Sequence, residues 1–374
     1  MYESAAYGRI SRAGATLTID LGALVENYGI LKTKLNPAVR CGAVLKADAY
    51  GLGMRHVAPA LAAVGCVEFF VAHVDEGLLA RKCLPASASI YILNGLPLGA
   101  EADAEAAELT PVLNSVKQVE AWSDHAVKRN RRLQAILQFD TGMSRFGLSP
   151  KEADHLLVSD VWRNNIELRY VMTHFACADE PSHPANLKQL ISFQAFARQY
   201  NGVPTSMANS SGIFLGSDFH GDLVRPGAAL YGINPVPLEP NPMRPVAQLS
   251  ARVVQTRIIN PDDGVGYGLE FWPERSLRLA TVSIGYADGI SRVLGNRGTV
   301  YFRGNPLPIV GRLSMDSMVI GLSDAVADAI NDGSYIDLIG PDQPIDHFAR
   351  SVGTIGYEVL AGLGPRIERI YRYN

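Results

Sequence analysis

The chain has 374 residues, more than one ordinary domain holds and enough to bury a large core. Apolar residues make up 47% of it, which excludes an intrinsically disordered protein. The net charge is −3, and acids and bases are mixed along the sequence, so we expect neither a nucleic-acid partner nor an anionic membrane partner. No apolar run is long enough to span a bilayer, and the polar residues 1–12 lack the apolar core of a signal peptide.

The cysteines and histidines narrow the possible chemistry further. The four cysteines are dispersed and contain no CxxC pair, which is typical of reduced thiols in a cytoplasmic protein. They are Cys41, Cys66, Cys83 and Cys177. None of the eight histidines has HExxH or another metal-ligand spacing, so no metal site is predicted.

Strand and helix patterns alternate over the first part of the chain. Residues 15–21 alternate like a strand, and apolar residues at helical spacing follow it. One later helix is predicted to open with a capping box at 149–152, with Pro150 in its first turn. The strand candidates end near Lys46, His73, Asn94, Asn114, Asp140, His174, Asn209 and Arg225. About eight strand–helix repeats predict an α/β fold, a (β/α)₈ TIM barrel, and an open doubly wound sheet is the alternative.

The pattern changes near residue 235. Residues 234–242 are rich in proline and are typical of a linker. Beyond them, short alternating runs separated by glycine and aspartate replace the helical periodicity. The sequence therefore predicts a barrel domain at 22–235 and a C-terminal all-β domain at 236–374.

Lys46 ends an apolar run and precedes a glycine-rich turn. A lysine at the end of a buried strand is costly to bury in its charged form, so we expect a lowered amine pKa. A neutral, positioned amine is what imine formation with an aldehyde requires. The same pattern fits a lysine that extends from a strand end to solvent, and the segment alone leaves both interpretations open.

Residues 44–53, VLKADAYGLG, resemble the cofactor-lysine motif of alanine racemases, which are barrel-type enzymes that use pyridoxal 5′-phosphate (PLP). At least six motifs in the family's order extend the resemblance from Thr16 to Arg366. It implies that Lys46 carries PLP and that the barrel domain binds it. It also implies that strand 15–21 joins the β domain, which the pattern alone leaves open.

The resemblance assigns further cofactor contacts. Arg225 would face the pyridine nitrogen and keep it unprotonated, which limits transamination. Tyr50 and residues 209–212 would hold the phosphate, which Gly227 would let the backbone approach closely. The implied cofactor-binding set is Lys46, Tyr50, Arg145, Asn209, Ser210, Arg225, Gly227 and Ala228. Without the resemblance, Arg225 also fits a surface salt bridge, and residues 209–212 also fit a helix cap.

Residues 139–147 resemble the family's substrate-arginine segment. Arg145 would contact the ring hydroxyl of the cofactor and the carboxylate of the substrate. Many members have a carbamylated lysine at the position of Gln138, which cannot form a carbamate. Either the amide oxygen of Gln138 or a bound anion would then support Arg145. Met315 and Tyr286 complete the implied substrate-binding set.

Two bases are implied for catalysis: Lys46 for D-alanine and Tyr267 for L-alanine. A tyrosine with a pKa near ~10 is a poor base unless cations lower that pKa. His174 and Arg292 are the matching residues for this role. Taken alone, Tyr267 fits an ordinary loop tyrosine, and His174 fits a structural hydrogen-bonding residue.

The resemblance implies an alanine racemase that interconverts L- and D-alanine, either for peptidoglycan or for alanine catabolism. In the family, the β domain of one subunit covers the barrel of its partner, so a homodimer with shared active sites is expected. One alternative is another PLP barrel enzyme, such as a broad-specificity amino acid racemase or a decarboxylase. A second is a non-enzymatic PLP carrier, although barrel-type carriers lack a β domain.

Overall fold

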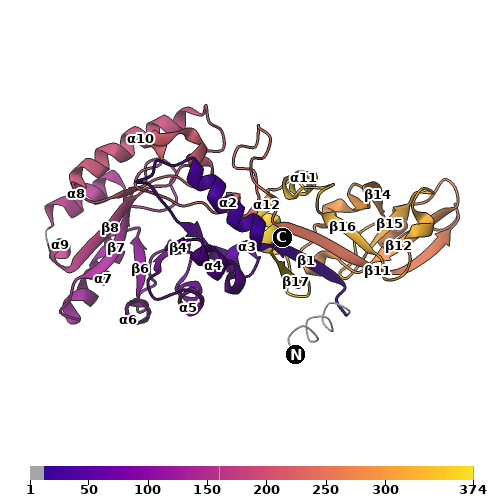
Figure 1. Cartoon of the computed structure of the whole chain (residues 1–374), viewed down its shortest axis with the longest axis horizontal. Coiled ribbons are helices and arrows are strands. Elements are labelled where there is room, and N and C mark those ends of the chain that lie inside the picture. The colour runs from indigo at the N-terminus through magenta and orange to yellow at the C-terminus, as the bar shows by residue number, and fades with distance from the viewer. Residues whose placement is uncertain (1–11, 160, 374) are drawn as a thin grey trace. The chain divides into compact units, whose positions relative to one another are not determined.

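The computed structural model describes residues 12–159 and 161–373 of the chain. Contacts between residues divide the chain into two compact units (Figure 1). Leu24–Arg244 forms the barrel unit, and the described residues up to Ala23 together with those from Pro245 onward form the β unit. Residues 234–242 therefore belong to the barrel unit, where Val236 and Met243 are buried.

Eight parallel strands of the described residues build the barrel unit. Gly42 divides the first strand into β2 and β3. The strands are β2 (Arg40–Cys41) and β3 (Ala43–Val44), then β4 (Glu68–Val71), β5 (Ser89–Ile92), β6 (Leu109–Leu113), β7 (Leu133–Gln138), β8 (Ile166–Met172), β9 (Thr205–Ser206) and β10 (Leu223–Val224). Each ends one to three residues before the position predicted from the sequence. The polar residues of the prediction therefore follow the carboxyl ends of the strands, where barrel enzymes place their active sites.

Backbone hydrogen bonds close this sheet into a barrel, so the alternative of an open doubly wound sheet is wrong. Strands β3 to β9 pair in chain order. Strand β10 pairs with β2, and the amide of Gly42 donates to the carbonyl of Val224 at 2.9 Å. On its other side, Arg225 donates its amide to the carbonyl of Ala208 at 2.8 Å. Buried side chains of seven of these strands pack in one cluster: Val44, Phe70, Tyr91, Val112, Ile136, Tyr170, Met172 and Leu223.

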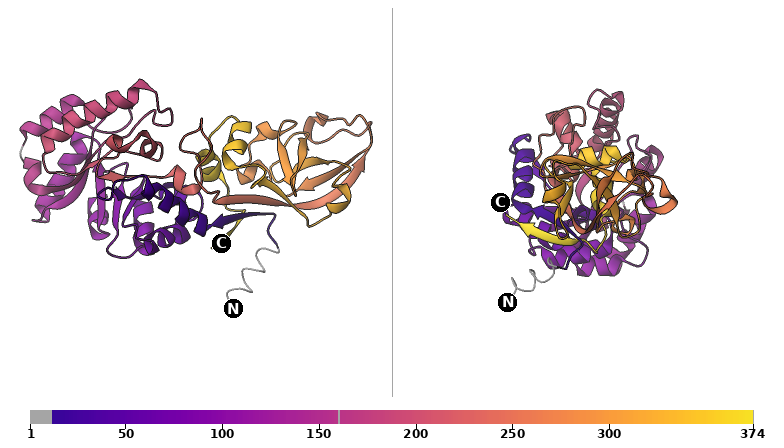
Figure 2. Two further views of the ribbon diagram at one scale, coloured as in Figure 1. Left: turned by 45° about the horizontal axis from the view of Figure 1, so that its top comes forward. Right: turned by 90° about the vertical axis from the view of Figure 1, so that its right-hand side faces the viewer.

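Helices separate the strands and lie outside them (Figure 2). They are α2 (Leu21–Thr33), α3 (Lys46–Tyr50), α4 (Met54–Ala63), α5 (Val74–Cys83), α6 (Glu101–Ala106), α7 (Val116–Lys128), α8 (Pro150–Val158), α9 (Val161–Asn165) and α10 (Pro184–Ala197). Short 3₁₀ turns are η1 (Arg198–Tyr200), η2 (Ser211–Leu215), η3 (Ser217–Phe219) and η4 (Ala228–Tyr231). The predicted capping box at α8 is confirmed, because Ser149 and Glu152 bond each other's backbone amides.

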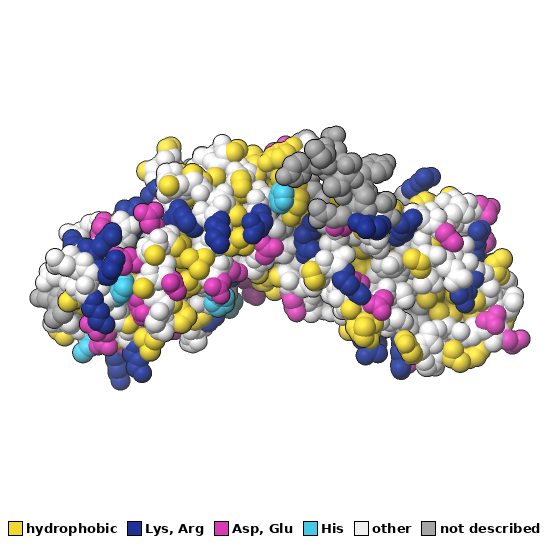
Figure 3. Space-filling model, turned by 90° about the horizontal axis from the view of Figure 1, so that it is seen from below, with side chains coloured by type: hydrophobic (Ala, Val, Ile, Leu, Met, Phe, Trp, Pro, Cys, Tyr) yellow, Lys and Arg dark blue, Asp and Glu magenta, His cyan; other side chains and the backbone are white. Residues whose placement is uncertain are grey.

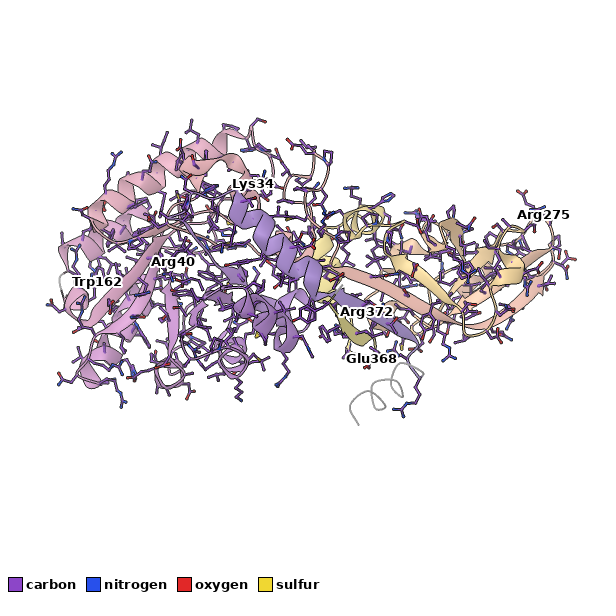
Figure 4. All side chains as sticks on the ribbon, viewed as in Figure 1. Lys34, Arg40, Trp162, Arg275, Glu368 and Arg372 are labelled. Atoms are coloured by element: carbon purple, nitrogen blue, oxygen red, sulfur yellow. The ribbon has the colours of Figure 1, made fainter. Side chains whose placement is uncertain are left out.

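The amino end of the barrel carries a buried carboxylate. Glu68, fully buried at the start of β4, pairs with Arg40 at 2.5 Å. Arg40 is labelled on the barrel unit in Figure 4. Tyr91 and Tyr170 donate their hydroxyls to the same carboxylate at 2.6 and 3.2 Å. These bonds satisfy the buried charge, so the carboxylate of Glu68 is a structural part of the barrel interior.

The β unit is built around one long strand, β11 (Ala247–Ile259), which also runs along this unit in Figure 1. The other strands are β1 (Ala15–Asp20), β12 (Leu277–Val282), β13 (Thr299–Phe302), β14 (Asn305–Val310), β15 (Met318–Leu322), β16 (Tyr335–Ile339) and β17 (Glu368–Arg372). Their order is β12-β15-β14-β13-β16-β11-β1-β17, and β12 also pairs with β11. That extra pairing closes a six-stranded barrel, and β1 and β17 extend the sheet from β11.

Short helices interrupt the β unit. The sequence predicts an all-β domain, yet α11 (Ile345–Ser351) and α12 (Gly356–Gly362) follow β16. The 3₁₀ turns η5 (Tyr267–Leu269), η6 (Tyr286–Asp288), η7 (Arg292–Leu294) and η8 (Ala327–Ala329) lie in its loops. Three of the predicted site residues, Tyr267, Tyr286 and Arg292, open such turns rather than lying in strands.

Candidate active site

Lys46 is the first residue of α3, which immediately follows the buried strand β3. The next four residues, Ala47–Tyr50, all have left-handed backbone angles, with φ between 53° and 57°. This conformation costs roughly 1–2 kcal/mol for each residue with a Cβ atom. The amide of Gly51 closes the turn on the carbonyl of Ala47 at 2.7 Å. Strain of this kind concentrates at functional sites, and it begins directly after Lys46.

The Lys46 amine lies near one cation and one carboxylate. Burial is the largest cause that lowers the pKa of the amine, and the nearby charge of Arg145 lowers it further. The carboxylate of Glu76 acts in the opposite direction. The resulting direction is the one that the sequence analysis expects, and it increases the fraction of neutral, nucleophilic amine.

Arg225 is buried at the end of β10, and every acceptor recorded for its side chain is electrically neutral. Its guanidinium donates to the hydroxyl of Ser206 at 2.6 Å and to the carbonyl of Thr173 at 2.8 Å. It also reaches the carbonyl of Met207 at 3.3 Å. Burial lowers the pKa of Arg225 to about 9, so it stays protonated at neutral pH. Arg225 is therefore a buried cation, and uncharged groups are its recorded hydrogen-bond acceptors among the described residues.

His174 lies against Arg225, which fixes its tautomer. The guanidinium of Arg225 donates to Nδ1 of His174 at 3.3 Å, so Nδ1 accepts and the ring proton is on Nε2. Burial, followed by the charges of Arg225, Arg145 and Lys46, lowers the pKa of His174 well below its usual value. The sequence analysis expects a cation here, whereas this shift favours a neutral ring near pH 7. His174 can lower the pKa of a phenol only by donating a hydrogen bond from Nε2.

The hydroxyl of Ser210 joins two turns that begin beside each other. It accepts the amides of Gly227 and Ala229 at 3.0 and 3.1 Å, which links η2 to η4. A Cβ atom at Gly227 would lie 2.3 Å from the hydroxyl of Tyr50, so any larger residue there must displace that phenol. Asn209 accepts the amide of Gly212 at 2.9 Å and thereby caps η2. The arrangement gathers two hydroxyls and the start of η4 at Ala228 into one donor-rich cradle.

Arg145 is exposed on the loop between β7 and α8, next to Phe146. The loop is held from within, because Asp140 accepts the amides of Gly142 and Ser144 at 2.9 and 3.1 Å. The buried Gln138 donates its amide to the carbonyl of Phe146 at 3.3 Å. Gln138 therefore holds the backbone beside Arg145, whereas the sequence analysis expects either the amide oxygen of Gln138 or a bound anion to support the guanidinium.

The β unit presents its own predicted residues on loops. Tyr267 is 71% exposed, Met315 52% and Tyr286 41%. Arg292 lies over the ring of Tyr286, 5.8 Å from its centroid. A Cβ atom at Gly285 would lie 2.4 Å from the carbonyl of Met315, so the two loops that carry Tyr286 and Met315 pack tightly. These loops are ordered by their backbones, while the side chains project into solvent.

Sequence reasoning missed the residues that hold the barrel site in place. Glu76 on α5 accepts the amide of Ala47 at 2.6 Å, and Gln189 on α10 donates to the carbonyl of His174 at 2.9 Å. Ser206 and Thr173 accept hydrogen bonds from Arg225. A glutamate three residues after His73, at a helix start, was the one visible signal, and it indicates a cap rather than a contact with Ala47.

No cluster of three or more metal-ligating side chains occurs among residues 12–159 and 161–373. Within the same residues, no helix combines the length and hydropathy that a membrane span requires. On the face drawn in Figure 3, acidic and basic side chains are interspersed.

Comparisons with known proteins agree with this geometry. Residues 19–235 match the model of the alanine racemase N-terminal domain, and residues 246–371 match that of the C-terminal domain. The catabolic alanine racemase of Mesorhizobium japonicum is 49% identical over 96% of this chain and 93% of its own length. The alanine racemase of Rhodospirillum rubrum is 44% identical over 97% of both chains.

A solved structure supports the same relationship. The alanine racemase from Bartonella henselae, crystallised with covalently bound pyridoxal phosphate, has a TM-score of 0.91 and 43% sequence identity. The match covers 96% of this chain and all of the Bartonella chain. This chain therefore belongs to the alanine racemase family.

Proposed function

We propose that this chain interconverts L-alanine and D-alanine with PLP attached to Lys46. One observation carries the proposal: a lysine with a lowered amine pKa follows a barrel strand in a chain that matches both alanine racemase domains. The closed barrel brings the residues after its strand ends to one face. Lys46 and Arg225 follow neighbouring strands at that face.

The residues present fit PLP. The cradle of Tyr50, Ser210 and the start of η4 at Ala228 suits a phosphate, since hydroxyls and amides donate to its oxygens. Asn209 would support the cradle by capping η2. Arg225 suits the pyridine nitrogen, because a protonated guanidinium can only donate to it. When bound, the cofactor supplies a sink for the electron pair left on Cα after proton removal.

The chain's own groups then move the proton. The amine of alanine would replace that of Lys46 on the cofactor, which frees the Lys46 amine to act as a base. Lys46 then takes the α-proton of D-alanine and Tyr267 that of L-alanine, and the opposite base returns a proton on the other face. A neutral His174 supports the Tyr267 phenolate by donating Nε2–H, and Arg292 adds positive charge near it. Arg145, Met315 and Tyr286 receive the substrate, with Arg145 paired to its carboxylate.

The proposed site needs two copies of the chain. In the β unit, the loops that carry the proposed residues expose several apolar and aromatic side chains, which supports an interaction surface there. They are Tyr267, Leu269, Trp272, Tyr286, Val293 and Met315. A two-fold dimer places this surface over the barrel of a second copy and builds two shared sites. The free thiols of Cys41, Cys66, Cys83 and Cys177 support a cytoplasmic location.

A chiral assay tests the function. Purified protein with PLP is given L-alanine, L-serine and L-lysine in separate reactions, and both enantiomers are quantified over time. The proposal predicts D-alanine accumulating to equal concentration with L-alanine, and much slower conversion of the other two. Release of carbon dioxide instead would favour a decarboxylase, and cofactor binding without turnover would favour a PLP carrier.

A further inference from the structure

Glu76 makes contacts that capping its own helix does not require. Its carboxylate accepts the amide of His73 at 3.2 Å, which is the capping bond at the start of α5. The same oxygen also accepts the amide of Ala72 at 2.7 Å. The other oxygen accepts the amide of Ala47, 29 residues away in sequence, at 2.6 Å. One carboxylate thus joins the ends of β3 and β4.

The bond from the Ala47 amide to Glu76 holds the peptide group that joins Lys46 to Ala47. The amide of Ala47 belongs to the same peptide plane as the carbonyl of Lys46, so fixing it fixes the backbone angle that follows the Lys46 Cα atom. The strained left-handed turn begins at this point. Asp48 secures its far end by accepting the amide of Met54 at 2.7 Å. Without the carboxylate at the near end, nothing else recorded for the described residues holds the Ala47 amide.

We propose that Glu76 is a positioning residue that anchors the peptide unit of Lys46 and so sets the direction from which the lysine amine enters the barrel site. This inference rests on the proposed function for its catalytic meaning. Its geometric content holds whether or not the chain racemises alanine. A capping role alone predicts that only α5 depends on Glu76.

The charges that face Lys46 come from several elements. Glu76 on α5 raises its pKa, and Arg145 on the loop after β7 lowers it. His174 after β8 is neutral and lies against Arg225, which follows β10. Glu76 is therefore the one anion that acts on the amine among the recorded charges. Removing that charge lowers the amine pKa further.

The test uses the full-length chain, with PLP and after its removal, and compares Glu76→Gln with Asp75→Asn. Asp75 is an exposed neighbour on the same helix, so its variant removes an equal charge without touching the turn. Amide hydrogen exchange of the peptide containing Ala47 should rise about 10- to 100-fold in Glu76→Gln, because charge-assisted bonds are lost. In Glu76→Gln protein from which PLP has been removed, the midpoint pH for acylation of Lys46 should fall. Neither should change in Asp75→Asn.

A second variant separates geometry from charge. Glu76→Asp keeps the charge but loses one methylene of reach, so exchange at Ala47 should rise while the acylation midpoint stays near that of wild type. It carries the test alone if Glu76→Gln does not fold. Both readouts are independent of racemase activity, so a chain that fails the chiral assay can still confirm the positioning role. Wild-type exchange at Ala47 in both Glu76 variants, or exchange raised only within α5, overturns it.

Discussion

The two units hold their proposed functional groups in opposite ways. In the barrel unit, Arg225 is buried and bonded to four groups, and the backbone beside Lys46 is locked by Glu76. In the β unit, Tyr267 and Met315 stand exposed on loops. A base that works at a fixed carbon atom must itself be fixed, and burial is also what strengthens its electrostatics. The barrel half is therefore prepared within its own unit, while the β half would be completed only in the proposed dimer, when the barrel of a second copy covers it.

Of the substitutions in the barrel half, Lys46→Ala should reduce racemase activity the most. Lys46→Ala removes both the proposed attachment point of the cofactor and one of the two bases, so kcat/KM for alanine should fall about 10⁴-fold. Borohydride reduction of wild type, followed by peptide mapping, should place the cofactor on Lys46. Lys151→Ala, on the exposed start of α8, is the matched control and should keep full activity. Cofactor recovered on another lysine contradicts the assignment.

Arg225 tests whether a fixed cation, rather than a merely polar group, is needed. Arg225→Glu allows the pyridine nitrogen to take a proton, so alanine should racemise about 100-fold more slowly. A larger share of turnovers should end in transamination, measured as pyruvate formed per D-alanine. An unchanged rate together with an unchanged product ratio would place Arg225 away from the ring nitrogen.

Gly227 tests the cradle with a smaller change. In Gly227→Ala, the added Cβ atom would lie 2.3 Å from the Tyr50 hydroxyl and must displace it. PLP affinity, measured by titrating the stripped protein, should fall about tenfold, which is 1.4 kcal/mol. Gly29→Ala is the control: it lies in α2 with open space around it and should leave affinity unchanged. Equal affinities in the two variants would mean that the cradle does not hold the phosphate.

The pH dependence of stability tests how the barrel half holds His174. Its pKa is lowered in the folded chain, so the unfolded chain binds the proton more readily below the usual value of 6.5. Stability is therefore complete above pH 6.5 and is lost as pH falls toward the folded pKa, by at most about 1.4 kcal/mol per pH unit. Urea unfolding at several pH values should show a shallower loss in His174→Asn than in wild type. Parallel curves would contradict a buried neutral ring.

Local signals in the sequence predicted much of the barrel half. Lys46 was found because an apolar strand followed by a glycine-rich turn is a short-range pattern, and Ser149 because a capping box spans four residues. The left-handed turn at Ala47–Tyr50 was not predicted, because alanine and tyrosine rarely adopt positive φ and only Asp48 among its four residues tolerates it well. A contact between Glu76 and Ala47 depends on how β3 and β4 pair, which no local pattern records.

The charge state of His174 shows a second limit. The residue type and its place at a strand end were visible, but its protonation depends on burial and then on Arg225, 51 residues later. Likewise, the sequence analysis predicted an all-β domain and did not predict the helices α11 and α12. Each is only seven residues long, so its periodicity is too short to detect. Position could be predicted from the sequence, whereas environment required the fold.

Mixed dimers test most directly the claim that each site joins the barrel of one chain to the β unit of another. Lys46→Ala damages the barrel half, Tyr267→Phe damages the β half, and each should be nearly inactive by itself. Unfolded together at equal concentration and refolded, they should recover activity from about a quarter of the wild-type number of sites, because one site of each mixed dimer receives neither lesion. Native mass spectrometry verifies that mixed dimers form. A mixture that contains them and stays inactive would contradict the shared site.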